Sequence, residues 1–340
     1  MTARPRVLVV DDSAFARKVL REVLVGSGRV DVVGIARDGL EALEKIEALA
    51  PDAITLDLVM PNLDGVGVLK ALPPELRVRA VIVSVSDAES ERGAEALALG
   101  AFDVVHKPTT LASATLYDLG DELVRKVLAA VDSRTADRDT TAVVAPRAAG
   151  GLAPAALVIG TSTGGPQALT RFLTALPKDF PLPIAAALHI PTGYTDSLAR
   201  RIDGASLIHV CEAAEGLVMR PGLAVVARGG VHLRLDRRGA DVVARLDTEP
   251  LGATHRPSVD VLFASAAAAY GGQLLALVLT GMGTDGLGGA RLVREAGGTV
   301  LAESPASAVV YGMPRAVWEA GIAVEQHSID TMAAAVLRKL

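Results

Sequence analysis

The sequence predicts an α/β protein made of two doubly wound parallel-sheet domains, the second with a small antiparallel β insert. Three observations indicate this class. Short apolar runs alternate with segments of helical spacing, as in parallel sheets covered by helices on both faces. The alternation stops over residues 132–154 and then resumes. The length of 340 residues also suits two domains.

The first domain is expected to span residues 1–131. One of its segments places Leu40, Leu43, Ile46 and Leu49 at helical spacing. A last helix is expected over roughly Leu116–Val131. Apolar strands are expected between the helices, at Arg6–Val10, Asp31–Ala36, Ala53–Leu58, Ala80–Val85 and Phe102–Val105.

Residues 132–154 read DSRTADRDTTAVVAPRAAGGLAP. They mix charge with Thr, Ala, Gly and Pro and show no sustained apolar period. This composition is typical of a linker.

The second domain is expected to span residues 155–340 and to resume the alternation. Parallel strands are expected at Ala156–Ile159, Ile184–His189, Leu274–Thr280 and Thr299–Ala302. Helices are expected at Gln167–Ala175, Asp196–Ile202, Val259–Tyr270 and Gly286–Glu295. Gly-rich turns join three short strands, which predict the antiparallel insert: Leu223–Ala227, Val231–Leu235 and Asp241–Leu246.

The composition favours a cytoplasmic protein. The sequence is 50% hydrophobic, but its apolar runs fall far short of the ~20 residues that span a bilayer. Acidic residues directly follow the first apolar run, which is unlike a signal peptide. The single cysteine, Cys211, excludes an internal disulfide and fits a reducing compartment. A net charge of −5 argues against nucleic acid as a partner.

Charged and hydroxyl side chains follow several strands of the first domain. Asp11 and Asp12 end the first strand, and Asp57 lies near the end of the third. Ser84 ends the fourth strand, and Lys107 the fifth. The carboxyl ends of parallel strands meet in one crevice, so the three carboxylates require a cation, and Mg²⁺ suits oxygen ligands. The set predicts a phosphoryl acceptor with Asp57 as nucleophile. The alternative is that the aspartates only cap a helix.

The segments VVDDSAFARK, LDLVMPNLDG and GAFDVVHKP resemble a bacterial response-regulator receiver domain, over residues 4 to about 131. The resemblance implies a flavodoxin-like fold and phosphorylation at Asp57 by a histidine kinase. It also implies Mg²⁺ ligation by Asp11, Asp12 and Asp57, and contact of the phosphoryl group with Ser84 and Lys107.

Two further expectations come with this resemblance. A cis peptide bond is expected between Lys107 and Pro108. Val104 stands where the family usually has an aromatic residue, which argues against an aromatic rotamer switch but not against phosphorylation.

A second constellation begins at the first strand of the second domain. Gly160–Gly164 reads G-x-S-x-G between a strand and a helix, which is the context of a nucleophile elbow. Ser162 would then stand exposed above the sheet. The motif by itself is equally compatible with a phosphate-binding turn, although it lacks the lysine of a P-loop.

The partners of Ser162 cannot be chosen from the residues alone. His189 closes a strand at the same edge, whereas His327 would fit the chain order of the α/β-hydrolases. Asp285 follows another strand and could orient a histidine, cap the helix that begins at Gly286, or do both. His209 is expected in the core, and His255 in a loop that contacts substrate or structure. Cys211 has no activating surroundings.

The motifs GTSTGG, HIPTGYTDSLARRI, EAAEGLVMRPG, VARGGVHL, HRPSVDVLF, LTGMGTDG and VVYGMPRAV are similar to the catalytic domain of the chemotaxis protein-glutamate methylesterases, the CheB family. This resemblance covers about residues 155–324. It implies a Rossmann-like domain and a triad of Ser162, His189 and Asp285. It also implies oxyanion support from Met282 and Thr163.

One position departs from the family. Leu188 stands where the family usually has Gln, which alters a hydrogen bond near the imidazole but removes no member of the triad.

The resemblance implies methyl-accepting chemotaxis receptors as the substrate, with removal of methyl groups and deamidation of receptor glutamines. The chain would be peripheral to the membrane through its receptors only. The receiver is expected to cover the active site until phosphorylation at Asp57 separates the domains. The rival is a general hydrolase of small esters. A DNA-binding output is excluded because the second domain has no helix-turn-helix pattern and no basic face.

Overall fold

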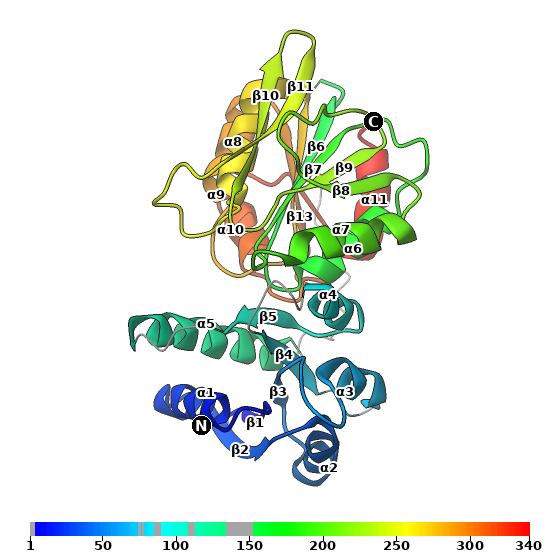
Figure 1. Cartoon of the computed structure of the whole chain (residues 1–340). Coiled ribbons are helices and arrows are strands. Elements are labelled where there is room, and N and C mark those ends of the chain that lie inside the picture. Colours follow the sequence, from blue (N-terminus) through cyan, green and yellow to red (C-terminus); the bar gives the residue numbers. More distant parts are fainter. Residues whose placement is uncertain (1–3, 74–75, 77, 85–89, 108–112, 134–151) are drawn as a thin grey trace. The chain divides into compact units, whose positions relative to one another are not determined.

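The computed structural model describes residues 4–73, 76, 78–84, 90–107, 113–133 and 152–340. The chain divides into two compact units, Met1–Thr135 and Ala136–Leu340. Figure 1 shows each unit as a sheet between helices. In the described part of the chain, no helix combines the length and hydrophobicity needed to cross a membrane.

The first unit holds a five-stranded parallel sheet in the order β2-β1-β3-β4-β5. Its strands are β1 (Arg6–Val10), β2 (Asp31–Ala36), β3 (Ala53–Leu56), β4 (Arg79–Ser84) and β5 (Asp103–His106). Helices α1 (Ala14–Gly26) and α5 (Ser113–Asp132) pack together on one face. The other face carries α2 (Gly39–Leu49), α3 (Gly65–Ala71) and α4 (Ser90–Ala98). The predicted doubly wound sheet is confirmed.

Side-chain caps begin three helices of this unit. Ser13, Asp38 and Asp64 each accept a hydrogen bond from the amide three residues ahead, at the first turn of α1, α2 and α3. Such caps satisfy amides that have no partner within the helix. Local sequence therefore determines where these three helices start.

The second unit holds a seven-stranded parallel sheet in the order β14-β13-β12-β6-β7-β9-β8. Its strands are β6 (Ala156–Thr161), β7 (Ile184–Leu188), β8 (His209–Glu212), β9 (Leu223–Val226), β12 (Leu274–Val278), β13 (Thr299–Glu303) and β14 (Glu325–His327). One face carries α6 (Gly165–Thr174), α7 (Tyr194–Ala205) and α11 (Ile329–Leu337). The other carries α8 (Val259–Tyr270), α9 (Leu287–Glu295) and α10 (Met313–Glu319).

The antiparallel insert is smaller than predicted. It consists of β10 (His232–Arg238) and β11 (Asp241–Asp247), which pair with each other and pack against α8. The expected third strand, β9, instead pairs in parallel with β7 and β8 inside the main sheet. The prediction for that strand was wrong because all four residues of β9 are buried, as in a central strand covered on both faces.

The expectation that His209 lies in the core was wrong. His209 is exposed, not buried in the core, and its Nδ1 lies 2.8 Å from Asp203 Oδ1. Alternation at the start of β8 turns Val210 inward and His209 outward, and Ile208, just before the strand, is also buried. Pro108 and residues 134–151 of the predicted linker lie outside the described residues, so the expected cis bond is not described.

The core of the second unit joins α8 to the sheet. Phe263 on α8 is fully buried. A Cβ added to Gly160 on β6 would lie 3.2 Å from Phe263 Cζ, and one added to Gly289 on α9 would lie 2.6 Å from Phe263 Cβ. The Phe263 side chain therefore fills the space between β6, the strand that precedes Ser162, and α9, the helix that follows Asp285.

We expect Phe263→Ala to destabilise the second unit by about 3–5 kcal/mol, because the fully buried ring leaves a cavity. Urea unfolding followed by fluorescence reports this unit alone, since Trp318 is the only tryptophan of the chain. Leu292→Ala is the control: its side chain on α9 is exposed, so a change within about 0.5 kcal/mol is expected. Equal losses in the two variants would contradict this account of the core.

Candidate functional site

The carboxyl ends of three neighbouring strands bring Ser162, His189 and Asp285 together. Ser162 follows β6, His189 follows β7, and Asp285 lies in the loop after β12. His189 Nδ1 lies 3.1 Å from Ser162 Oγ, and His189 Nε2 lies 2.7 Å from Asp285 Oδ2. The three side chains form a continuous chain of hydrogen bonds, which is the arrangement of a serine nucleophile, its base and an orienting acid.

The hydrogen-bond network assigns the tautomer of His189. A carboxylate only accepts, so Nε2 carries the proton toward Asp285 and the lone pair of Nδ1 faces Ser162. The side chains of His189 and Asp285 are only 8% and 13% exposed. Their contact is therefore shielded from water, which strengthens it.

Asp285 also closes the N-terminus of α8. Its carboxylate accepts hydrogen bonds from Val259 N at 2.8 Å, Asp260 N at 3.0 Å and Ser258 Oγ at 3.0 Å. Burial alone would raise the pKa of Asp285, but the hydrogen bond from His189, the positive charge of that ring when it is protonated and the hydrogen bonds from the two amides hold that pKa well below its usual range. Asp285 is thus ionised and ready to stabilise an imidazolium.

The alternative that Asp285 caps the helix directly after it is not what the structure shows. Helix α9 begins at Leu287 with Gly286 as its cap residue, and its cap has no side-chain hydrogen bond. The carboxylate turns instead to α8, which lies 25–27 positions earlier in the sequence. Sequence spacing carries no signal for such a contact.

The turn after β6 holds Ser162 in place through β12. Ser162 N donates to Thr280 O at 3.0 Å, and Thr161 Oγ1 donates to the same oxygen at 2.7 Å. A Cβ added to Gly281 would lie 2.9 Å from Ser162 Cβ and 2.3 Å from Met313 Sδ. Only glycine allows the loop after β12 to approach the serine this closely.

The backbone amides of Thr163 and Met282 lie near Ser162. Thr163 follows the serine, and Met282 follows Gly281, which touches it. Within the described residues, neither the Thr163 nor the Met282 N–H donates a hydrogen bond to the protein. Both amides are therefore available for a substrate oxygen.

The competing candidates lie elsewhere. His327 ends β14, with β13 and β12 between it and β6, and its Nε2 lies 2.8 Å from Glu325 Oε2. Cys211 lies on the edge strand β8, and burial raises the pKa of its thiol. Neither is arranged to act with Ser162. Leu188, the departure beside His189, is fully buried, and a Cβ added to Gly165 would lie 2.5 Å from Leu188 Cδ1.

A buried carboxyl lies behind the serine turn and was not found from the sequence. Glu303 at the end of β13 is 1% exposed. It accepts from Thr280 N at 2.7 Å and from Ser307 Oγ at 2.8 Å. Burial raises the pKa of Glu303 from 4.5 to about 7, against these two hydrogen bonds. Glu303 supports Thr280, which in turn holds Ser162.

The first unit assembles the predicted acid pocket. Asp11, Asp12 and Asp57 each offer a carboxylate oxygen, and these oxygens lie within 4.8 Å of one another. Lys107 Nζ lies 2.5 Å from Asp11 Oδ2 and 2.7 Å from Asp57 Oδ2. Ser84, buried at the end of β4, accepts from Lys107 N at 2.7 Å. An all-oxygen set of this kind fits Mg²⁺.

Charge within this pocket is only partly balanced. Burial raises the pKa of Asp57, although Lys107 opposes the shift. Burial lowers the pKa of Lys107, but Asp57 and Asp11 outweigh it and leave that pKa above its usual value. Three carboxylates around one ammonium leave net negative charge for a cation.

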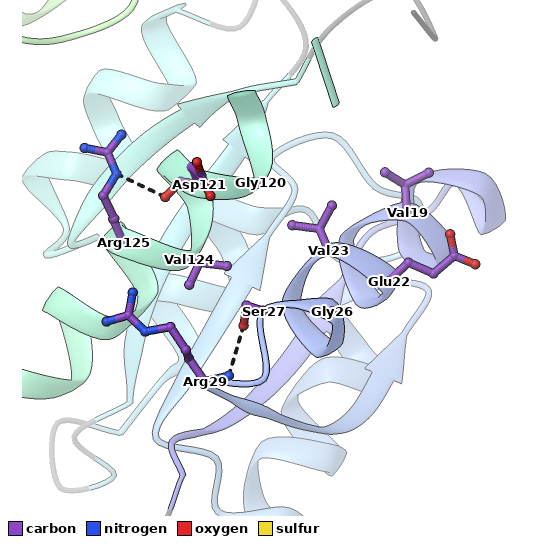
Figure 2. Close-up of a pocket in the computed structure, with 10 residues that line it drawn as sticks. All are labelled: Val19, Glu22, Val23, Gly26, Ser27, Arg29, Gly120, Asp121, Val124 and Arg125. Carbon is purple, nitrogen blue, oxygen red and sulfur yellow. Dashed lines mark hydrogen bonds between the residues drawn. The ribbon is translucent and has the colours of Figure 1, made fainter. Parts of the chain in front are cut away.

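A cavity of about 920 Å³ lies between α1 and α5 (Figure 2). It is lined by Val19, Glu22, Val23, Gly26, Ser27, Arg29, Gly120, Asp121, Val124 and Arg125. The lining includes the end of α1 and the turn into β2, so the cavity lies at the amino ends of the strands. The acid pocket lies at their carboxyl ends, and the cavity is therefore no part of it.

The fold and these two sites define a class of protein: a response-regulator receiver joined to a serine hydrolase domain. A family model described as "Response regulator receiver domain" matches residues 7–116. A model described as "CheB methylesterase" matches residues 157–336. The chain belongs to the CheB methylesterase family, which confirms both resemblances drawn from the motifs.

Similar proteins share the whole architecture. A Myxococcus xanthus protein named protein-glutamate methylesterase/protein-glutamine glutaminase 5 is 55% identical, over 98% of this chain and 97% of its own length. A Geobacillus kaustophilus protein-glutamate methylesterase/protein-glutamine glutaminase is 43% identical, over 98% of each chain. The crystal structure of the Thermotoga maritima CheB methylesterase catalytic domain aligns with a TM-score of 0.54 and 39% identity, over 56% of this chain and 100% of that one.

We expect Glu303 to make the second unit less stable as pH rises. The Glu303 carboxyl of the folded state keeps its proton up to about pH 7, whereas that of the unfolded state releases it near pH 4.5. The contribution of Glu303 to the free energy of unfolding is therefore fully present below pH 4.5 and is lost as pH rises toward 7. The loss is at most about 3 kcal/mol. Glu303→Gln should remove it, leaving the variant more stable than wild type at about pH 8 and similar near pH 4.5, by urea unfolding followed at Trp318.

Glu325→Gln serves as a control of opposite sign. Hydrogen bonds from Lys339 and His327 outweigh burial and lower the pKa of Glu325. Its stabilising effect is present at neutral pH and is lost as pH falls, so this variant should be less stable than wild type at neutral pH. A Glu303→Gln variant that is no more stable than wild type at about pH 8 would contradict the assignment.

Proposed function

We propose that this chain removes methyl groups from methylated glutamates of methyl-accepting chemotaxis receptors, with release of methanol. The observation that carries the proposal is the continuous contact of Ser162, His189 and Asp285 in a member of the CheB methylesterase family. Relatives named protein-glutamate methylesterase over their whole length support the substrate class.

The geometry suits acyl transfer. His189 Nδ1 accepts the proton of Ser162 as Oγ attacks the γ-carbonyl of the ester, and Asp285 stabilises the imidazolium. The backbone amides of Thr163 and Met282 support the oxyanion. The imidazolium then protonates the leaving methanol, and water activated by His189 releases the glutamate from Ser162.

The same site would deamidate receptor glutamines. The attack on an amide γ-carbonyl passes through the same tetrahedral oxyanion, with ammonia as the leaving group. The names of the relatives include protein-glutamine glutaminase, which supports this second reaction.

We infer that the receiver controls the esterase. A chemotaxis histidine kinase would phosphorylate Asp57, with Lys107 and Ser84 in contact with the phosphoryl group. Asp11, Asp12 and Asp57 would hold Mg²⁺, which neutralises charge during phosphoryl transfer. In this scheme the linker over residues 132–154 joins the domains, and phosphorylation frees an active site that the receiver covers. The protein would work in the cytoplasm beside its receptors.

We expect Ser162→Ala to abolish methanol release from tritium-methylated receptor membranes, because Ser162 Oγ is the hydroxyl that contacts His189 Nδ1. The fall should exceed about 10³-fold. Unfolding followed at Trp318 checks that the variant is folded. Full release by folded Ser162→Ala would overturn the proposed nucleophile, and ester hydrolysis without release from cognate receptors would favour a general esterase.

We expect Asp57→Ala to keep basal methanol release and to lose its increase with a small-molecule phosphodonor and Mg²⁺. The reason is that the variant retains the esterase site but lacks the acceptor carboxylate. A gel that retards phosphoproteins should show phosphorylated wild type only. Occlusion further requires the fragment 155–340 to exceed the unphosphorylated full chain, and equal activity would refute that picture.

A further inference from the structure

A second histidine covers the face of His189. The rings of His189 and His255 are stacked, with centroids 4.0 Å apart and planes inclined by 21°. His255 lies in the segment between β11 and α8, far from β7 in the sequence. The hydrogen bonds of the mechanism involve only the edge of the His189 ring, so this contact has no part in the chemistry described above.

The two edge hydrogen bonds leave one motion of the base unrestrained. They run from opposite nitrogens of His189, to Ser162 and to Asp285, and so define an axis through the ring. Moving the ring along its normal, perpendicular to both hydrogen bonds, barely changes either distance, yet it takes the lone pair of Nδ1 out of line with the serine proton. A flat ring packed against the imidazole face opposes this movement.

Hydrogen bonds fix the position of the segment that carries His255. The carbonyl of Arg256 accepts from Gly230 N at 3.1 Å, and the Arg256 guanidinium donates to Leu251 O at 2.6 Å. Ser258 N donates to Nδ1 of the fully buried His232 at 3.1 Å. The segment that carries His255 is therefore attached to the start of β10, and it is not a free loop.

The Gly229–Gly230 turn, which precedes β10, also contacts the segment that follows His189. Gly229 N donates to Thr195 Oγ1 at 3.3 Å, and a Cβ added to Gly229 would lie 2.9 Å from Thr192 Cα. The Gly229–Gly230 turn thus touches the backbone after His189 and the backbone after His255. Glycine at position 229 is required by this close approach. The two rings are therefore placed relative to each other by one rigid turn.

We propose that His255 is a positioning residue for the general base: its stacked ring holds the imidazole of His189 in the plane that keeps Nδ1 in line with Ser162. The proposal rests on the proposed function because it assumes that His189 activates Ser162. It concerns orientation, so it predicts an effect on the rate of Ser162 chemistry rather than on substrate affinity.

The test uses the full chain and a fluorophosphonate, in which serine Oγ displaces fluoride from phosphorus while the base takes the serine proton. Mass spectrometry locates the label, and the rate at saturation, kinact, is compared with the binding constant KI. His255→Ala and His255→Gln should lower kinact by about ten- to a hundredfold and leave KI unchanged. His255→Phe should restore kinact to near wild type, because phenylalanine keeps a flat ring.

Two controls separate positioning from folding. Unfolding followed at Trp318 should be similar for all variants, and the Gln–Phe comparison decides the matter if His255→Ala does not fold. Leu251→Ala lies on the same segment with its side chain 60% exposed, and should label at the wild-type rate.

Several results would overturn the proposal: wild-type kinact in His255→Gln, no rescue by phenylalanine, a change confined to KI, or an equal fall in Leu251→Ala. The failure of the proposed substrate is distinguishable, because the probe requires only an activated serine. Labelling of wild type at Ser162 without methanol release from methylated receptors would reject the receptor substrate and leave the positioning result standing.

Discussion

The arrangement of the site in the second unit depends on the hydrogen bonds that the Asp285 carboxylate accepts. It accepts from His189 on one side and from the N-terminus of α8 on the other. A buried carboxylate without such donors would take up a proton and lose its charge. Helix amides, whose dipoles favour negative charge, keep it ionised. The anion thereby joins the loops after β7 and β12 to the start of α8.

Strand order explains why these residues meet. Strands β12, β6 and β7 are neighbours in a parallel sheet, so their carboxyl ends share one edge. The triad order Ser162, His189, Asp285 along the chain follows from the way these strands are connected, and differs from the α/β-hydrolase order because the sheet is connected differently. Two further residues lie around these three side chains. His255, in a loop, stacks on His189, and the buried Glu303, at the end of β13, accepts a hydrogen bond from Thr280.

The first unit compensates the charge of its buried carboxylates in a different way. Its three carboxylates also lie at strand ends, but the compensating charge is the Lys107 ammonium within hydrogen-bond reach of Asp11 and Asp57. A mobile cation or a phosphoryl group can change that balance, whereas helix amides around Asp285 cannot be exchanged. The charge of the acid pocket can therefore change with its contents, whereas the donors around Asp285 stay constant.

The sequence by itself determined the alternation of strands and helices, the residues at the strand ends, and the serine turn, because these depend on local periodicity and on glycine. Motif resemblance then chose His189 over His327, which spacing had left open. Only the tertiary structure decided that β9 belongs to the main sheet, that Asp285 closes α8, and that His255 stacks on the base. These contacts join segments far apart in the chain, and strand order, which no local pattern encodes, brings them together.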